Sequence, residues 1–112
     1  MARDPKNFNN TNQLSSTAGD IVAAVAASTK SIVRKLSFRN TSSSNRTVTV
    51  YVIASGGSAG TTNELVVKAI APGKTWNVIE IQGEVLEAGM KLQAKQDSGT
   101  DVNANCSGAN VT

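Results

Sequence analysis

The sequence predicts an all-β fold: an antiparallel, jelly-roll-like β-sandwich with an extended N-terminal arm. Strand-sized segments of alternating apolar and polar residues recur at short, regular spacing, and clusters of turn-forming residues separate them. Ser, Thr, Asn and Gly are abundant, whereas aromatic residues make up only 4% of the chain, a composition typical of short strands joined by polar turns. With 112 residues, the chain is expected to form one domain whose core needs no disulfide.

Residues 1–16 show almost no hydrophobic periodicity and are rich in Asn. Because such a segment cannot build a core, we interpret it as an arm that is mobile in the free protein and ordered against a partner. The β-sandwich domain is expected to span residues 17–112. Its first segment, DIVAAVAAS, is followed by a turn and a β-branched run, so residues 19–28 are interpreted as a strand, with a short helix as the alternative.

Two segments, SIVRKLSF and TVTVYVIA, flank the turn-rich loop NTSSSNR and are interpreted as a β-hairpin. In the first segment, strict alternation predicts that Ile32 and Arg34 share one face, while Val33 shares the other face with Lys35 and Arg39. Lys35 and Arg39 are expected to be exposed, and such a polar surface suits contact with a protein partner.

The second half of the chain continues the pattern. ELVVKAIA is interpreted as a strand, PGK as a turn and TWNVIEIQ as the return strand, whereas SGGSAGTTN is expected to be a flexible loop. MKLQAK and DVNANC alternate regularly, which predicts that Leu92, Ala94 and Cys106 share their faces with other apolar residues. Trp76 is interpreted as core or interface filler rather than as a platform for stacking sugars or bases.

The residue types in the chain do not support catalysis, and we predict that the protein is not an enzyme. The chain has no His, and Cys106 is expected to be a buried hydrophobe rather than a nucleophile. Glu84 and Glu87 lie in a Gly-flanked connection rather than across a cleft, so they are not expected to act as an acid–base pair. Asp97 and Asp101 flank a plain turn, and no metal or cofactor is expected.

Charge and hydropathy restrict the partners and the location. The net charge is +3 without any run of like charges, which is typical of a solvated surface, so neither nucleic acid nor a membrane is expected as a partner. The N-terminal segment lacks the apolar region of a secretory signal. The longest apolar stretch, IVAAVAA, is far shorter than the roughly 20 residues that cross a bilayer. We therefore expect a protein that stays in a cytosol-like compartment.

The order of several motifs resembles that of a known group of proteins. Residues 30–95 contain in turn a strand, an NTS loop, the strand TVTVY, a Gly/Ser loop, the turn IAPGKT and the ending VLEAGMKLQA. This order resembles the small β-sandwich virion proteins of tailed bacteriophages. Within that group, the chain length and the polar arm are most similar to the capsid decoration, or staple, proteins of epsilon-15-like short-tailed phages.

The resemblance implies a jelly-roll sandwich that binds the outside of the major capsid protein and acts as a cement protein for the shell, with further copies of itself as a second partner. The protein would then lie on the capsid exterior of the virion, after assembly in the host cytoplasm. A tail-, neck- or fibre-associated subunit with a receptor-binding role is one alternative, and a small β-barrel that binds single-stranded nucleic acid is another. The residues expected to contact the partner are Arg3, Lys6, Phe8, Leu14, Lys35 and Arg39.

Overall fold

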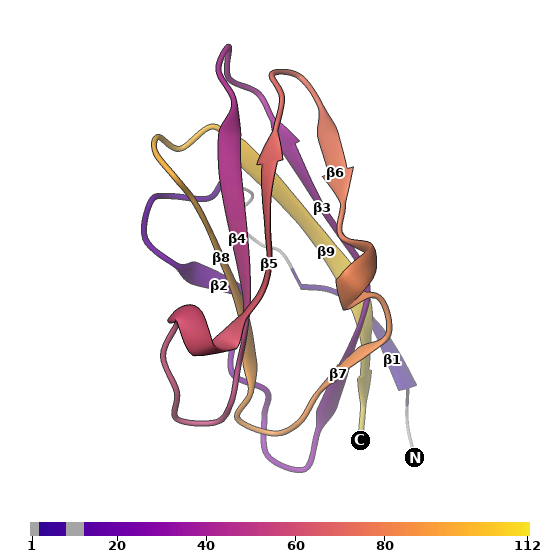
Figure 1. Cartoon of the computed structure of the whole chain (residues 1–112). Helices are drawn as coiled ribbons and strands as arrows, with labels where there is room; N and C mark the ends of the chain where they lie inside the picture. Colours follow the sequence, from indigo (N-terminus) through magenta and orange to yellow (C-terminus); the bar gives the residue numbers. More distant parts are fainter. Residues whose placement is uncertain (1–2, 9–12) are drawn as a thin grey trace.

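The computed structural model describes residues 3–8 and 13–112, and in these residues the predicted all-β sandwich is confirmed (Figure 1). Sheet A contains, in spatial order, β1 (Arg3–Asn7), β9 (Val102–Val111), β3 (Lys30–Asn40) and β6 (Thr75–Asn77), and β7 (Glu84–Leu86) also pairs with β3. Sheet B contains, in spatial order, β2 (Gly19–Val22), β8 (Lys91–Gln96), β4 (Arg46–Ile53) and β5 (Glu64–Ile70). Two short 3-10 turns, η1 (Thr61–Asn63) and η2 (Ile79–Ile81), precede β5 and follow β6. In the described ranges, no helical segment is long and apolar enough to span a membrane.

Consecutive strands mostly lie in opposite sheets. The predicted hairpin of SIVRKLSF and TVTVYVIA is wrong, because β3 belongs to sheet A and β4 to sheet B. The return strand predicted after β5 is likewise in the other sheet, as β6. Alternation identifies a strand and its buried face, but it does not identify the neighbouring strand, and here the chain crosses the core after most strands. As a result β3 pairs with β9, which lies more than 60 residues further along the chain.

A β-bulge in β3 changes the face that each residue presents. The register between β3 and β9 shifts between Val33 and Lys35, so that Arg34 is the extra residue. Val33 is therefore buried, and the prediction that it shares the exposed face of Lys35 is wrong. Gly108 of β9 lies opposite Val33, and a Cβ at that position would overlap the carbonyl oxygen of Ile32. The two central strands of sheet A thus approach closely where the bulge occurs.

Strand β4 is buried on both of its faces. Val48 and Val50 point into the core between the sheets, as the alternation predicts. Tyr51 and Ile53, on the opposite face, are buried as well, because the loop after β4 returns over them. A Cβ on Gly57 of this loop would lie 3.2 Å from Cγ2 of Ile53.

The loop after β4 is organised by one side chain. Asn63 donates a hydrogen bond from Nδ2 to the carbonyl oxygen of Ser58 (2.7 Å) and accepts one at Oδ1 from the backbone N–H of Gly60 (2.9 Å). The sequence predicts a flexible loop because its small residues cannot order a backbone by packing. The hydrogen bonds of Asn63 therefore add to the contact of the loop with Ile53.

Several segments differ in length or type from the expectation. Residues 19–28 contain a strand only over Gly19–Val22 and no helix. In TWNVIEIQ the strand ends at Asn77, since η2 begins two residues later and turns Ile79 outward. Trp76 is buried core, as predicted, and its ring stacks on Phe38 with 5.7 Å between the ring centroids.

The described part of the arm lies against the sandwich of its own chain. Strand β1 pairs antiparallel with β9 at the edge of sheet A, and the backbone N–H of Phe8 donates to the carbonyl oxygen of Cys106 (3.0 Å). Leu14 is buried in the core, and the ring of Phe8 packs against that core. The expectation that residues 1–16 contribute nothing to a core is therefore wrong for Leu14.

A polar end, which we define as Asn40, Arg46, Gln96 and Asp101, closes one end of the sandwich. Asn40 is fully buried and donates from Nδ2 to the carbonyl oxygens of Ser44 (2.7 Å) and Ile70 (2.8 Å). Gln96 is also fully buried, and its amide contacts Asp101 Oδ1 (2.8 Å) and the backbone N–H of Val102 (2.9 Å). In the described residues, every side-chain nitrogen or oxygen that is itself fully covered has a hydrogen-bond partner.

Candidate functional site

The predicted contact residues of the arm fall into two groups. Arg3 and Lys6 lie on β1, where their backbones are opposite Val111 and Gly108 of β9. Phe8 and Leu14, by contrast, pack on their own sandwich. The structure therefore brings Arg3 and Lys6 to one edge of sheet A, and it directs Phe8 and Leu14 inward.

Lys35 and Arg39 are both exposed on the outer face of sheet A. Their neighbours across the strand pair are Ser107 and Asn103 of β9, which are polar as well. Arg39 borders a shallow hollow of about 300 Å³, lined otherwise by small polar residues and Ala104. This part of the outer face of sheet A is thus polar and includes the cations Lys35 and Arg39, as the alternation of β3 predicts beyond its bulge.

Of the carboxylates considered for a reactive site, Glu87 and Asp101 form ion pairs, with Lys30 and Arg46 respectively. Glu87 lies at the surface, with 3.5 Å between its Oε2 and Nζ of Lys30. In residues 3–8 and 13–112, no group of three or more His, Cys, Asp or Glu residues could hold a metal ion. Cys106 is buried in the core, and desolvation raises the pKa of its thiol to about 12, so the thiolate form is suppressed.

Arg46 and Asp101 form the best-aligned ion pair of the polar end. The guanidinium donates from Nε to Asp101 Oδ1 (2.9 Å) and from Nη2 to Oδ2 (3.1 Å), so the pair is bidentate. These hydrogen bonds, together with one from Gln96, hold the pKa of Asp101 below its ordinary value. The turn around Asp97 and Asp101 is therefore structural, and the Asp101 carboxylate serves protein contacts.

We use the term apolar edge for four exposed large apolar residues on the edge elements β5, η2 and β7, namely Leu65, Val67, Ile79 and Val85. Leu65 and Val67 belong to β5, one of the two edge strands of sheet B, while Ile79 lies on η2 and Val85 on β7. Ile79 is 71% exposed and Val67 is 52% exposed. Of the seven residues of β5, only Ile70 is buried, although most of them are apolar. Exposed apolar side chains on an edge strand are typical of a contact surface.

A hollow of about 430 Å³ lies between β5 and β6, next to Ile79 of the apolar edge. Residues of β5 and β6 line it together with Ile79. Figure 1 shows these two strands beside one another, joined by a turn. Trp76 forms part of its wall, and Nζ of Lys68 lies 5.8 Å from the centroid of the indole ring. The cation covers a ring that is otherwise buried in the core.

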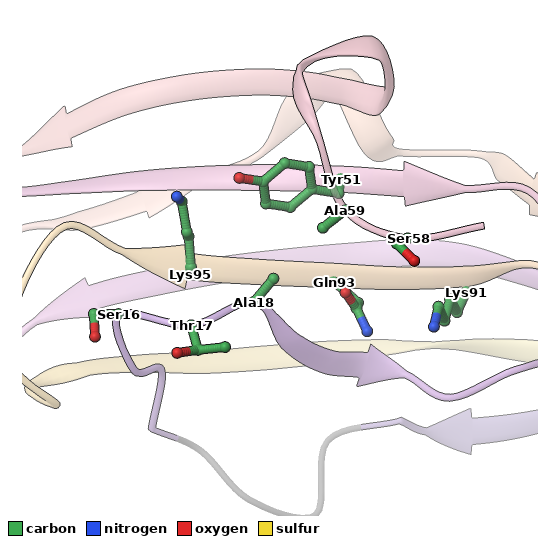
Figure 2. A pocket seen from close by; sticks show the side chains of 9 residues that line it. All are labelled: Ser16, Thr17, Ala18, Tyr51, Ser58, Ala59, Lys91, Gln93 and Lys95. Atoms are coloured by element: carbon green, nitrogen blue, oxygen red, sulfur yellow. The ribbon is translucent and has the colours of Figure 1, made fainter.

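A second recess, which we call the sheet B groove, lies on the outer face of sheet B (Figure 2). Tyr51 of β4 and Lys91, Gln93 and Lys95 of β8 line it. The segment before β2 and the loop after β4 form its sides, so three regions distant in the sequence meet around about 520 Å³. Lys91 and Lys95 are half-buried, and neither forms an ion pair with a described residue.

Neither the apolar edge nor the sheet B groove was predicted from the sequence. The alternation of MKLQAK does show that Lys91 and Lys95 share a face, and this is confirmed. Nothing local, however, indicates that Tyr51 pairs with Gln93, because this contact depends on the register between β4 and β8. For the apolar edge, the signal in the sequence is Ile79 within TWNVIEIQ, since alternation puts it on the face opposite Trp76.

The comparisons with known proteins concern the fold. The chain matches no family model and no curated protein. It is similar in fold to a chain in a structure of infectious bursal disease virus, Gx strain, with 16% identity and a TM-score of 0.50. The match covers 97% of this chain and 31% of the viral chain. It is also similar to a chain in a crystal structure of an IBDV viral particle (19% identity, TM-score 0.45, 97% of this chain and 30% of that one).

A further match is a chain from Bacillus endospore appendages, described as a family of disulfide-linked pili (14% identity, TM-score 0.46, 99% of this chain and 85% of that one). The chain spans about a third of the length of the viral chains that it matches. At such identities the likeness is one of fold, and the match at a TM-score of 0.50 supports the two-sheet sandwich.

Proposed function

We propose that the protein is a non-enzymatic capsid decoration protein of a tailed bacteriophage, bound to the outer surface of the major capsid protein. The observation that carries the proposal is the apolar edge. Its residue Ile79 is 71% exposed and borders the hollow between β5 and β6, so it is available to a protein partner. The resemblance of residues 30–95 to small virion proteins of tailed phages gives the partner. The protein functions on the capsid exterior after assembly in the host cytoplasm.

Burial of the apolar edge supplies the attraction in this proposal. Moving apolar surface out of water contributes about 25 cal/mol per Å² of buried area, so several partly exposed side chains add to a useful contact energy. Strand β5 also presents an unpaired edge, to which a strand of the capsid protein or of another copy can pair. Contacts repeated over many copies on a shell then stabilise the closed lattice.

The arm and the outer face of sheet A provide the polar part of the proposed contact. Arg3 and Lys6 lie at the edge of sheet A, and Lys35 and Arg39 lie on its outer face. Phe8 and Leu14 are assigned a different role, since they hold the arm on its own sandwich. A deletion that tests the arm should accordingly remove residues 1–7 and keep Phe8 and Leu14.

The proposal is tested by adding the purified protein to phage particles that lack it. We expect saturable binding to the shell and a higher temperature of shell opening, since a ligand that binds only the closed shell stabilises it. Ile79→Ser should reduce occupancy about tenfold, while Glu80→Ser, in the same 3-10 turn, should leave it unchanged. Deletion of residues 1–7 should also weaken binding.

Two results would overturn the proposal. If particles with and without the protein open at the same temperature, the protein does not act as cement. If the protein is located only at the tail of complete particles, the tail-associated alternative replaces the capsid role.

A further inference from the structure

The sheet B groove contains a buried side chain whose polar atom is left without a protein partner. Tyr51 is only 5% exposed, yet its hydroxyl makes no hydrogen bond to any described residue. Because no side-chain oxygen in the described residues is both fully covered and unpaired, this hydroxyl keeps its access to the groove. Figure 2 shows it directed along the floor of the groove toward the Lys95 end. A group that occupies the groove can therefore accept its hydrogen bond.

The charge of the groove is positive. Lys91 and Lys95 are the charged residues of its lining, and neither forms an ion pair with a residue in the described ranges. Gln93 lies between the two lysines on β8. Its Nε2 donates a hydrogen bond to the nearby carboxylate of Asp20 (2.7 Å). Two half-buried lysines and a tyrosine hydroxyl without a hydrogen bond to a described residue thus line one recess.

We propose that the sheet B groove binds an extended, acidic peptide segment of a partner protein. Lys91 and Lys95 are four residues apart on one face of a strand, which separates their Cα atoms by about 13 Å. An extended peptide has the same repeat, so carboxylates at positions i and i+4 of the ligand match both lysines. Tyr51 then donates its hydroxyl to the ligand between these two positions.

The same observations disfavour a carbohydrate in the groove. Sugar rings are commonly held against exposed aromatic faces, but Tyr51 is only 5% exposed, so little of its ring is open for stacking. The sides of the groove carry small hydroxyl residues, Ser16, Thr17 and Ser58, which suit a polar peptide backbone. The volume, about 520 Å³, lies within the range of sites that hold a ligand of a few residues.

The inference gives a contact chemistry for the protein partner in the proposed function, and it is tested on the free protein. Isotope-labelled protein is titrated with the peptide GESTSEG, whose glutamates are four residues apart, and with GQSTSQG as the uncharged control. We expect amide shifts at Lys91, Lys95 and the segment 16–18 with the acidic peptide, at millimolar to micromolar affinity. The uncharged peptide should bind at least tenfold more weakly.

Variants separate the groove from a general effect of charge. Lys91→Gln with Lys95→Gln should reduce affinity at least tenfold, whereas Lys35→Gln, which removes a cation from sheet A, should leave it unchanged. Tyr51→Phe keeps the buried ring and removes the hydroxyl, so we expect about a fivefold loss, as for one hydrogen bond.

Three results would overturn the inference. Equal binding of the two peptides would show that carboxylates are not recognised. An equal loss in Lys35→Gln would show that the effect is one of net charge. Tighter binding of a glucuronic-acid disaccharide than of the acidic peptide would assign the groove to acidic sugars. Shell binding is measured separately on particles, so it can persist when peptide binding fails.

Discussion

The polar end and the sheet B groove both contain polar side chains, but in the described residues these are hydrogen-bonded within the protein at the polar end and partly unpaired in the groove. At the polar end, Asn40 and Gln96 have no exposed surface, and their amides are hydrogen-bonded on both the nitrogen and the oxygen. In the groove, the Tyr51 hydroxyl and two lysines have no partner among the described residues. A polar cluster that satisfies itself holds the fold together, whereas one that is left open is available to a ligand.

The largest expected effect follows from breaking the polar end at Asn40. Its side chain takes part in four hydrogen bonds, to Ser42 twice and to the carbonyl oxygens of Ser44 and Ile70. At about 1 kcal/mol for each, with some compensation by solvent, Asn40→Ala should lower the free energy of unfolding by about 3 kcal/mol. Thermal unfolding should then occur about 15 °C lower. Ser58→Ala, in the side of the groove, serves as the control and should unfold like the wild type.

A smaller effect is expected at Asn63, which organises the loop beside the groove. Asn63→Ala removes the hydrogen bonds to Ser58 and Gly60 and should cost about 1 kcal/mol, because both partners can turn to solvent. Hydrogen exchange should accelerate at the Gly60 amide and remain slow in β4. Unchanged exchange at Gly60 would contradict the role given to Asn63.

The ion pair at the polar end predicts a dependence of stability on pH. Hydrogen bonds from Arg46 lower the pKa of Asp101 in the folded state, so the carboxylate stabilises the fold above its unfolded pKa. This contribution is lost as the pH falls below the unfolded pKa and through the lower folded pKa of the carboxyl. Asp101→Asn should be less stable than the wild type at neutral pH, and the gap should narrow on acidification. Chemical denaturation at several pH values measures the free energy of unfolding of both proteins. A difference between them that does not change with pH would exclude the titration of Asp101 as the cause of the difference.

The smallest effect is expected for the groove lysines. Because Lys91 and Lys95 make no ion pair with described residues, Lys91→Gln and Lys95→Gln should each change the free energy of unfolding by less than about 0.5 kcal/mol. If urea unfolding shows that either variant loses more than about 1 kcal/mol of unfolding free energy, the lysines stabilise the fold, as the residues of the polar end do.

Local sequence patterns predict the strands of this fold better than they predict its pairing. The alternation in β8 and β9 correctly placed Leu92, Ala94 and Cys106 inside. Strict alternation failed at Val33, because a bulge at Arg34 inserts an extra residue that no local pattern reveals. The hairpin of β3 with β4 failed for a different reason: both strands have a core face, and a loop of turn formers can lead across the core as well as back along it.

The candidate site was less accessible to sequence analysis than the fold. The exposure of Lys35 and Arg39 follows from a local pattern, and so does the shared face of Lys91 and Lys95. The sheet B groove depends on a register between distant strands, which brings Tyr51 to Gln93. Leu14 was misjudged for a similar reason, since an isolated apolar residue in a polar segment gives no periodic signal of its burial.

The long-range pairing of β3 with β9 also sets an order for folding during synthesis. Every neighbour of β9 in sheet A, β1 on one side and β3 on the other, is made long before it. Until β9 leaves the ribosome, β1 and β3 have no strand between them, and the backbone groups that later pair with β9 face solvent or chaperones. Sheet B is different, because β4 and β5 can pair as a local hairpin as soon as they emerge. Such distant pairings slow folding. Sheet B should therefore begin to form first on the nascent chain, with sheet A completed by the insertion of a single strand.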